Sequence, residues 1–353
     1  MSSNIPRDPP PRTVHLLGIM PRSGTNYLCD LLSLHPDCGA TVHITENFLF
    51  AHARTLCTYV DQVHNSWQAL WGEFGEELKA PLLAAIGEGL ENYLYGLTEP
   101  AWVHKYISPQ EVQESPYVKT SPPVCISRTP SVENLALIPR LTDSKVILLV
   151  RDGRSVIESG MRSFGWWYED ALHRWAKAAD TILQTAPQHP DQMYTVRYED
   201  LLQNKKEELW NIFTFIGIDP EIYDYEREPP VRGSSTFHSK PTELNWRGVQ
   251  RTESFDPLNR WRRWKPARHA RFNWVAGKQL RAFGYEPVSV EGLHWKVYNL
   301  IFDALWPLWP PLRQIARKIL PQELRGKILW QRGIRYRKSI INQNANHKTT
   351  PPG

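Results

Sequence analysis

The sequence predicts an α/β fold in three layers, α/β/α, with a mostly parallel central sheet and a mainly helical C-terminal extension. Four short runs have the apolar or β-branched composition of strands: residues 14–19, 117–119, 145–150 and 192–197. Apolar residues recur at helical spacing over three segments: residues 76–95, 167–185 and 204–216. Each of these segments is long enough to connect two parallel strands, so we expect a parallel sheet.

The composition is that of a globular protein. The chain has 353 residues, of which 41% are hydrophobic and 22% are charged, enough to bury one large core. Its four cysteines form no CxxC pair and no zinc-ligand spacing, so we expect reduced thiols in a cytoplasmic protein. Residues 1–12 are polar and proline-rich, without the apolar stretch of a signal peptide, and we expect them to be flexible.

The first motif lies between the first expected strand and the helix after it, at residues 18–26, Gly-Ile-Met-Pro-Arg-Ser-Gly-Thr-Asn. A strand that turns through a glycine loop into a helix leaves backbone N–H groups pointing at one spot, beside the positive end of the helix dipole. A Walker loop would place Lys directly after its second glycine, whereas Thr25 follows Gly24 here. The sequence therefore predicts a phosphate-like anion held by Arg22, Ser23, Gly24, Thr25 and Asn26.

The second motif follows the strand at residues 145–150. Arg151 ends that strand, Gly153 permits a tight turn, and Ser159 falls in the second turn of the helix that follows. An arginine and a serine that converge in this way could hold a second phosphate. In the alternative interpretation, Arg151 pairs with Asp152 and Ser159 is a surface hydroxyl.

Together these motifs resemble the sulfotransferase family, which transfers a sulfuryl group from 3′-phosphoadenosine 5′-phosphosulfate (PAPS) to a hydroxyl or amine. Residues 21–25 are similar to the family's 5′-phosphosulfate loop, residues 150–154 with Ser159 to its 3′-phosphate motif, and residues 196–201 to another recurrent segment. The resemblance covers about residues 14–286 and is nearest to the branch of tyrosylprotein and bacterial sulfotransferases. It implies a P-loop NTPase-like sulfotransferase fold over residues 13–290, with PAPS as co-substrate, PAP as product and no required metal.

The resemblance also implies catalytic residues. Glu46 is our candidate for the base that takes the acceptor proton, and an ungapped match from Pro21 leaves His43 as the alternative base. Glu46 could instead cap or pair with a neighbouring helix. Lys119 occupies a place where relatives carry a catalytic lysine before Thr or Asp and Pro, and we expect it to act with Arg22 on the leaving phosphate. An exposed lysine at a strand end is the other interpretation.

Three further residues complete the expected site. Tyr198 could lie against the adenine or complete the core, and Arg232 and Ser235 could add phosphate contacts. The acceptor could be a carbohydrate, a lipid, a small molecule or a peptide, and we expect no nucleic-acid partner. A metal-dependent phosphotransferase of P-loop type stays as an alternative, although it would bring a Walker lysine and a metal-binding carboxylate. A non-catalytic, nucleotide-binding protein at a membrane is the other alternative.

The C-terminal part of the sequence is basic. Of the chain's net charge of +5, residues 291–353 carry eleven Lys or Arg against three acidic residues. We therefore expect a basic, Trp-containing helical extension over residues 291–340 and a disordered tail over residues 341–353. The apolar segment 298–312 is broken by prolines and shorter than the roughly 20 residues that span a bilayer. It could lie on an anionic membrane, at the cytoplasmic face, or pack its tryptophans on the body.

Overall fold

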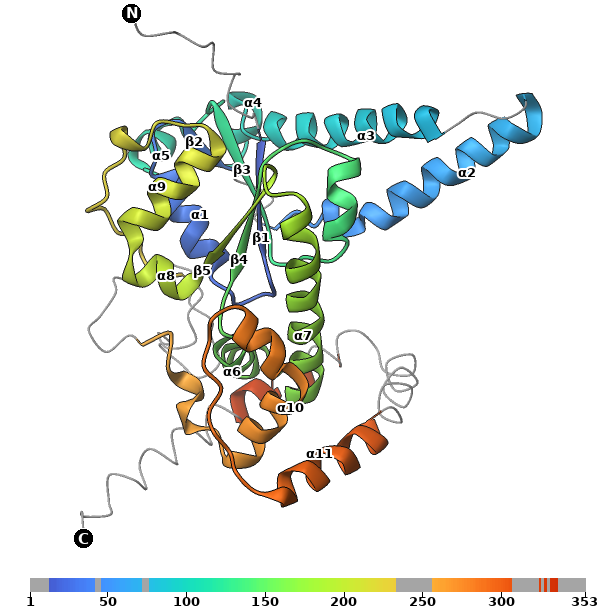
Figure 1. Cartoon of the computed structure of the whole chain (residues 1–353). Helices are drawn as coiled ribbons and strands as arrows, with labels where there is room; N and C mark the ends of the chain where they lie inside the picture. Colours follow the sequence, from blue (N-terminus) through green and yellow to red (C-terminus); the bar gives the residue numbers. More distant parts are fainter. Residues whose placement is uncertain are drawn as a thin grey trace, which may run out of the picture. The chain divides into compact units, whose positions relative to one another are not determined.

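The computed structural model describes residues 13–41, 46–71, 76–232, 256–306, 324, 327–328 and 331–335 (Figure 1). The chain divides into two compact units. The first unit consists of Met1–Arg151 and Ala178–Pro229, and the second of Asp152–Lys177 and Pro230–Gly353.

The first unit is built on a parallel sheet of five strands in the order β2-β3-β1-β4-β5. The strands are β1 Thr13–Gly18, β2 Cys38–Ala40, β3 Val124–Thr129, β4 Val146–Val150 and β5 Met193–Arg197. All six residues of β1 are buried, as expected for a central strand whose two neighbours, β3 and β4, cover both of its edges. The chain leaves β1 toward one edge of the sheet and later returns on its other side. The carboxyl end of β1 is therefore a topological switch point, where such sheets bind ligands.

Helices cover both faces of this sheet. Figure 1 shows α1 (Thr25–Ser33), α8 (Tyr198–Gln203) and α9 (Lys205–Ile216) on one side, and α2 (Ala53–Trp71) and α3 (Glu76–Gly96) on the other. Both α1 and α3 contact β1 and β3. The predicted three-layer α/β/α arrangement with a mostly parallel sheet is confirmed.

Shorter elements complete the first unit. They are α4 (Pro100–Val103), α5 (Pro109–Glu114) and the 3-10 turns at Phe50–His52, Leu135–Arg140, Ala186–Gln188 and Pro220–Ile222.

The prediction of a strand at residues 117–119 is wrong. These residues lie outside any strand, and the second strand in this part of the chain is β3, which begins at Val124. The Lys119 ammonium donates to the carbonyl oxygens of Ser33 (2.5 Å), His35 (2.8 Å) and Cys38 (2.6 Å). These carbonyls lie where α1 ends and β2 begins, so Lys119 satisfies acceptors that the end of a helix leaves open. It lies at the amino edge of the sheet, opposite the loop that carries Arg22.

The second unit is mainly helical. It contains α6 (Gly153–Phe164), α10 (Pro266–Ala282), α11 (Leu293–Leu305) and a 3-10 turn at Arg260–Arg263, and α7 (Tyr168–Thr185) runs from this unit into the first. Asp152 caps α6 by accepting from the Arg154 backbone N–H at 2.8 Å. The buried Arg154 guanidinium pairs with the same carboxylate at 2.7 Å and stacks over Trp261 at 3.7 Å. The domain boundary expected after residue 290 falls inside this unit.

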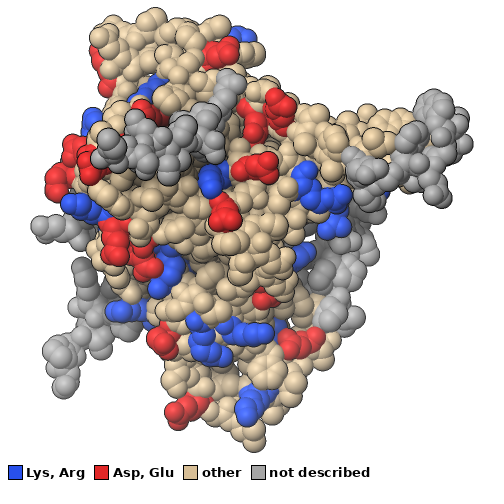
Figure 2. Space-filling model, turned by 45° about the horizontal axis from the view of Figure 1, so that its top comes forward, with Lys and Arg blue, Asp and Glu red and all other residues tan. Residues whose placement is uncertain are grey.

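The two units have opposite charge. The first contains 15 Lys and Arg against 26 Asp and Glu, and the second 27 against 11. The basic excess is therefore not confined to the part of the sequence after residue 290: residues 230–290 carry 12 Lys and Arg against 4 Asp and Glu, whereas residues 152–177 carry four of each. Figure 2 shows one face of the molecule, on which acidic and basic side chains are interspersed.

We expect Lys119→Ala to destabilise the protein without abolishing binding at the loop after β1. Removing the ammonium deletes its hydrogen bonds to three carbonyls, which should cost about 2 kcal/mol of the free energy of unfolding. Urea unfolding measures this loss, with Lys105→Ala at an exposed position as the control. If Lys119→Ala instead kept its stability but lost turnover, a catalytic role for Lys119 would be supported.

Candidate active site

The loop between β1 and α1 is tightly folded. A Cβ on Gly18 would lie 2.4 Å from the Ser23 hydroxyl, so only glycine leaves room for this close approach. Ser23 is fully buried, and its hydroxyl (2.8 Å) and backbone N–H (3.2 Å) both donate to the carbonyl of Met20. The side chain of Ser23 therefore holds the shape of the loop.

The start of α1 forms the predicted anion cradle. Gly24 precedes the helix with φ of +105°, a left-handed conformation that favours glycine. It brings no side chain to cap the helix, and the N–H groups of residues 25–27 have no acceptor within α1. Together with the helix dipole, these donors create a site of positive potential at the carboxyl end of β1.

Arg22 adds a cation to this cradle at a cost in backbone strain. Its φ of +78° is unusual for a residue with a side chain. Its carbonyl accepts a hydrogen bond of 2.8 Å from Nη1 of Arg151, the residue that directly follows β4. Burial and the nearby Arg151 lower the pKa of Arg22 to about 10, although Glu46 and Tyr198 oppose this change. Two guanidinium groups thus share one small region, and a bound anion would stabilise both.

Tyr198 packs against this loop. The Arg151 guanidinium lies 4.5 Å from the centre of the Tyr198 ring, and a Cβ on Gly24 would lie 2.5 Å from two ring carbons. Tyr27 meets the same ring edge-on at a centroid distance of 6.0 Å. Tyr198 is only 6% exposed. This packing favours the interpretation of Tyr198 as part of the core over stacking on an adenine.

Glu46 lies at the same edge of the sheet as the loop. The next residue, Asn47, donates its backbone N–H to the Arg128 carbonyl (3.2 Å) and its amide to the Ser127 hydroxyl (2.7 Å). These bonds fasten the segment to the carboxyl end of β3. The Glu46 side chain is exposed, and its charge raises the pKa of Arg22, which indicates that the two are close.

Arg128 was missed by the sequence analysis. It lies near the end of β3, in register with Leu16 of β1. It also lies close to Cys29 in α1: burial raises the pKa of that thiol, and Arg128 opposes the rise. The signal was present, because a β-branched run ends in Arg128-Thr129-Pro130, a cation followed by Thr and Pro. Lys119 is likewise followed by Thr120 and Pro122, but Ser121 stands between them.

The remaining expected residues are placed as follows. Thr25 is buried and Asn26 half-buried at the start of α1. Ser159 is buried in α6 and Arg232 is exposed, both in the second unit. His43 and Ser235 lie outside the described residues. Among the residues that the structure describes, no group of three or more His, Cys, Asp or Glu is arranged to hold a metal ion.

A buried hydrogen-bond network connects the end of β3 to β1 and α3. His15 in β1 contacts Glu91 of α3 through Nε2 (3.2 Å) and Ser127 of β3 through Nδ1 (3.4 Å). Thr142 also donates to Glu91. Burial alone would raise the pKa of Glu91, but hydrogen bonds from His15, Ser144 and Thr142 outweigh it and lower the pKa. Because Ser127 also accepts from Asn47, the network reaches the segment that carries Glu46.

The chain is similar to known sulfotransferases. The model of the sulfotransferase family matches residues 16–221, and the chain belongs to this family. A Caenorhabditis briggsae protein named as a candidate protein-tyrosine sulfotransferase is 24% identical over 211 residues, which cover 57% of this chain and 64% of that protein. The chain thus spans slightly less than two thirds of that relative.

Two further similarities extend over more of the chain. Protein-tyrosine sulfotransferase 1 of Danio rerio is 22% identical over 281 residues, 77% of this chain and 72% of that protein. Among solved structures, the sulfotransferase domain of the Synechococcus PCC 7002 olefin synthase is similar with a TM-score of 0.43 and 19% identity, covering 80% of this chain and 98% of that domain.

We expect Glu91→Gln to destabilise the protein in a pH-dependent way. A carboxylate whose pKa is lowered in the folded state stabilises it above the unfolded value near 4.5, and this contribution is lost as the pH falls through the lower folded value. At neutral pH the variant should lose about 1–2 kcal/mol of unfolding free energy. Urea unfolding at neutral and acidic pH measures both values. The exposed Glu88→Gln on the same helix is the control, and a loss independent of pH would contradict the network.

Proposed function

We propose that this member of the sulfotransferase family moves the sulfuryl group of PAPS to a hydroxyl group of its acceptor. The observation that carries the proposal is the loop after β1, where a helix N-terminus and the neighbouring guanidinium groups of Arg22 and Arg151 meet. This arrangement suits a phosphosulfate, because it offers fixed N–H donors and positive charge without a Walker lysine.

The donor would be held at its two anionic ends. In this proposal the N–H groups at Gly24, Thr25 and Asn26 bind the 5′-phosphosulfate beside Arg22, while Ser23 keeps the loop in shape. The sequence motif assigns the 3′-phosphate to Arg151 and Ser159. PAP, which keeps both phosphates, would then bind as the product.

The transfer step needs a base and positive charge, both of which lie at this edge of the sheet. The acceptor oxygen attacks sulfur as its proton passes to Glu46, and the bond from sulfur to the bridging phosphate oxygen breaks. Arg22 and Arg128 would stabilise the negative charge that develops on that oxygen. Lys119, bound to three carbonyls at the opposite edge, is replaced by Arg128 in this role.

A tyrosyl hydroxyl of a peptide or protein is our proposed acceptor. Support comes from the two relatives named as protein-tyrosine sulfotransferases. Carbohydrates, lipids and small molecules belong in the same acceptor screen, because one fold can host sites for different substrates.

Thermal unfolding with PAP, compared with ATP plus magnesium, tests the donor site. PAP should stabilise the protein by about 2.7 kcal/mol at a concentration near 100 times its Kd, whereas ATP with magnesium should stabilise it far less. Gly24→Ala should lose the PAP effect, because its Cβ would meet the Tyr198 ring and its φ is positive. Gly217 also has a positive φ, but an added Cβ would meet open space there. Gly217→Ala is therefore the matched control for backbone strain and should still be stabilised by PAP. Equal or greater stabilisation by ATP with magnesium would favour a phosphotransferase.

Arg128→Ala tests the transfer step separately from donor binding. We expect sulfuryl transfer from labelled PAPS to a tyrosyl peptide to fall by about 10²–10³-fold, as when a charge-stabilising group is removed, with little change in PAP binding. Arg128→Lys should recover part of the activity, because it restores the charge. The exposed Arg140→Ala is the control. Full activity of Arg128→Ala would exclude Arg128 from the transfer step.

A further inference from the structure

Helix α11 (Leu293–Leu305) is attached to its unit through polar contacts. Asn299, only 2% exposed, lies on the inner side of the helix and accepts from Arg271 of α10 at 3.5 Å. Asp303 pairs with the same guanidinium at 2.7 Å and accepts from the Trp274 indole N–H at 2.7 Å. Arg271 is 1% exposed and is also paired with Glu169. This network fixes which side of α11 faces its own unit.

The outer side of α11 is apolar. Five large aliphatic side chains on this side are half or more exposed: Leu293 (75%), Val297 (50%), Leu300 (59%), Ile301 (56%) and Leu305 (61%). They recur at intervals of three and four residues, so they form one stripe along the helix. We call these five residues the α11 stripe. An amphipathic helix normally turns such a stripe toward its core, whereas the inner side of α11 carries the buried Asn299 and the half-buried Phe302 and leaves the stripe outside.

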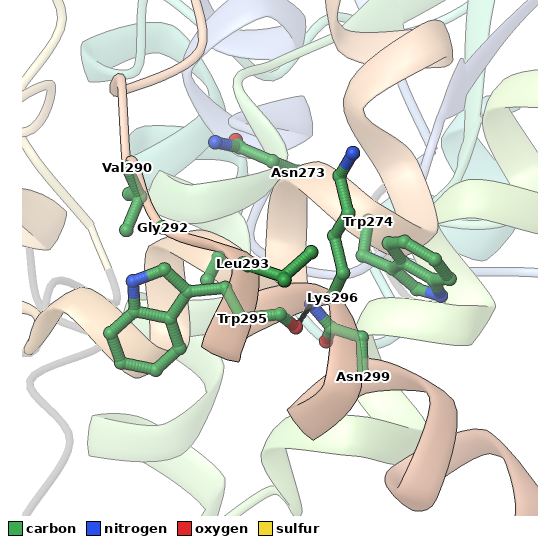
Figure 3. Close-up of a pocket in the computed structure, with 9 residues that line it drawn as sticks. Asn273, Trp274, Val290, Gly292, Leu293, Trp295, Lys296 and Asn299 are labelled. Atoms are coloured by element: carbon green, nitrogen blue, oxygen red, sulfur yellow. Dashed lines mark hydrogen bonds between the residues drawn. The ribbon is translucent and has the colours of Figure 1, made fainter.

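A groove between α10 and α11 borders the stripe. It has a volume of about 470 Å³ and is lined by the two tryptophans Trp274 and Trp295, by Leu293 of the stripe and by Lys296 (Figure 3). Trp274 is 43% exposed, and Lys296 is exposed. An exposed apolar stripe with tryptophan and lysine beside it has the composition of helices that lie in a membrane interface.

The charge of the second unit favours an anionic partner. This unit carries 27 Lys and Arg against 11 Asp and Glu, and α11 lies in it. A second copy of the chain would bring two strongly positive units together, which opposes pairing through this face. Anionic lipids complement both the charge and the apolar stripe. Across the described part of the chain, none of the helices has the length and hydropathy of a transmembrane span.

We propose that the α11 stripe docks on the surface of an anionic bilayer, with the helix lying along the interface. The stripe inserts between lipids, while Lys296 and the other basic residues of the second unit attract the headgroups. This proposal is independent of the sulfuryl transfer described above.

Flotation of the full-length chain with lipid vesicles tests the proposal. The wild-type chain should float with vesicles of phosphatidylcholine and phosphatidylserine and much less with phosphatidylcholine alone. The double substitution Leu300→Ser and Ile301→Ser should lower the vesicle-bound fraction about tenfold, because it removes apolar contact without touching the inner polar network. Ile222→Ser, equally exposed in the first unit, should float like the wild type. Lys296→Glu should weaken binding to the anionic vesicles.

Two outcomes would overturn the proposal. One is equal flotation of the wild type and the double variant, which would place any membrane binding outside the stripe. The other is a concentration-dependent dimer, measured by light scattering, that the double variant loses while neither protein binds vesicles. Matching thermal unfolding curves for the wild type and the double variant ensure that a loss of flotation reports the surface and not the fold.

Discussion

The hydrogen bond from the Arg151 guanidinium to the carbonyl of Arg22 is the contact on which the candidate site depends. It joins the end of β4 to the loop after β1 and holds Arg22 in a left-handed conformation that the residue would not adopt alone. Tyr198, the first residue of α8 directly after β5, supports the same loop by stacking on Arg151 and filling the space beside Gly24. Three adjacent parallel strands thus position one loop, and the sheet supplies the rigidity that an anion site needs.

This construction has an electrostatic consequence. Burial and the neighbouring Arg151 guanidinium lower the pKa of Arg22, so an anion bound in the loop would relieve the repulsion between the two cations. On the β3 side, the hydrogen bonds of Asn47 and the network through Ser127, His15 and Glu91 keep the segment of Glu46 at the same edge. Positive charge and a carboxylate are therefore brought together by buried contacts that come from separate parts of the chain.

The second unit uses buried polar contacts for a different result. Arg271 gathers Glu169, Asn299 and Asp303, and because these bonds face inward, the aliphatic side chains of α11 must face outward. A buried arginine is costly unless it is paired, so this network resists any rotation of the helix that would hide the stripe. In both units a buried arginine organises the neighbouring segments: Arg151 positions the loop after β1, and Arg271 orients α11 so that its stripe is exposed.

The features that depend on neighbouring residues could be predicted from the sequence: the strand, glycine loop and helix at residues 14–33, the turn after Arg151, and the parallel sheet with crossover helices. It also placed Glu46 near the loop as a candidate base, which stays a prediction. The sequence could not show that Lys119 lies at the amino edge of the sheet and Arg128 near the carboxyl end of β3, because the edge at which a residue lies depends on where the strand begins, and β3 begins after Lys119. Nor could it show that Tyr198 packs beside Gly24 or that the α11 stripe faces outward. Contacts between distant segments, which no local pattern records, decide which side of an element is covered.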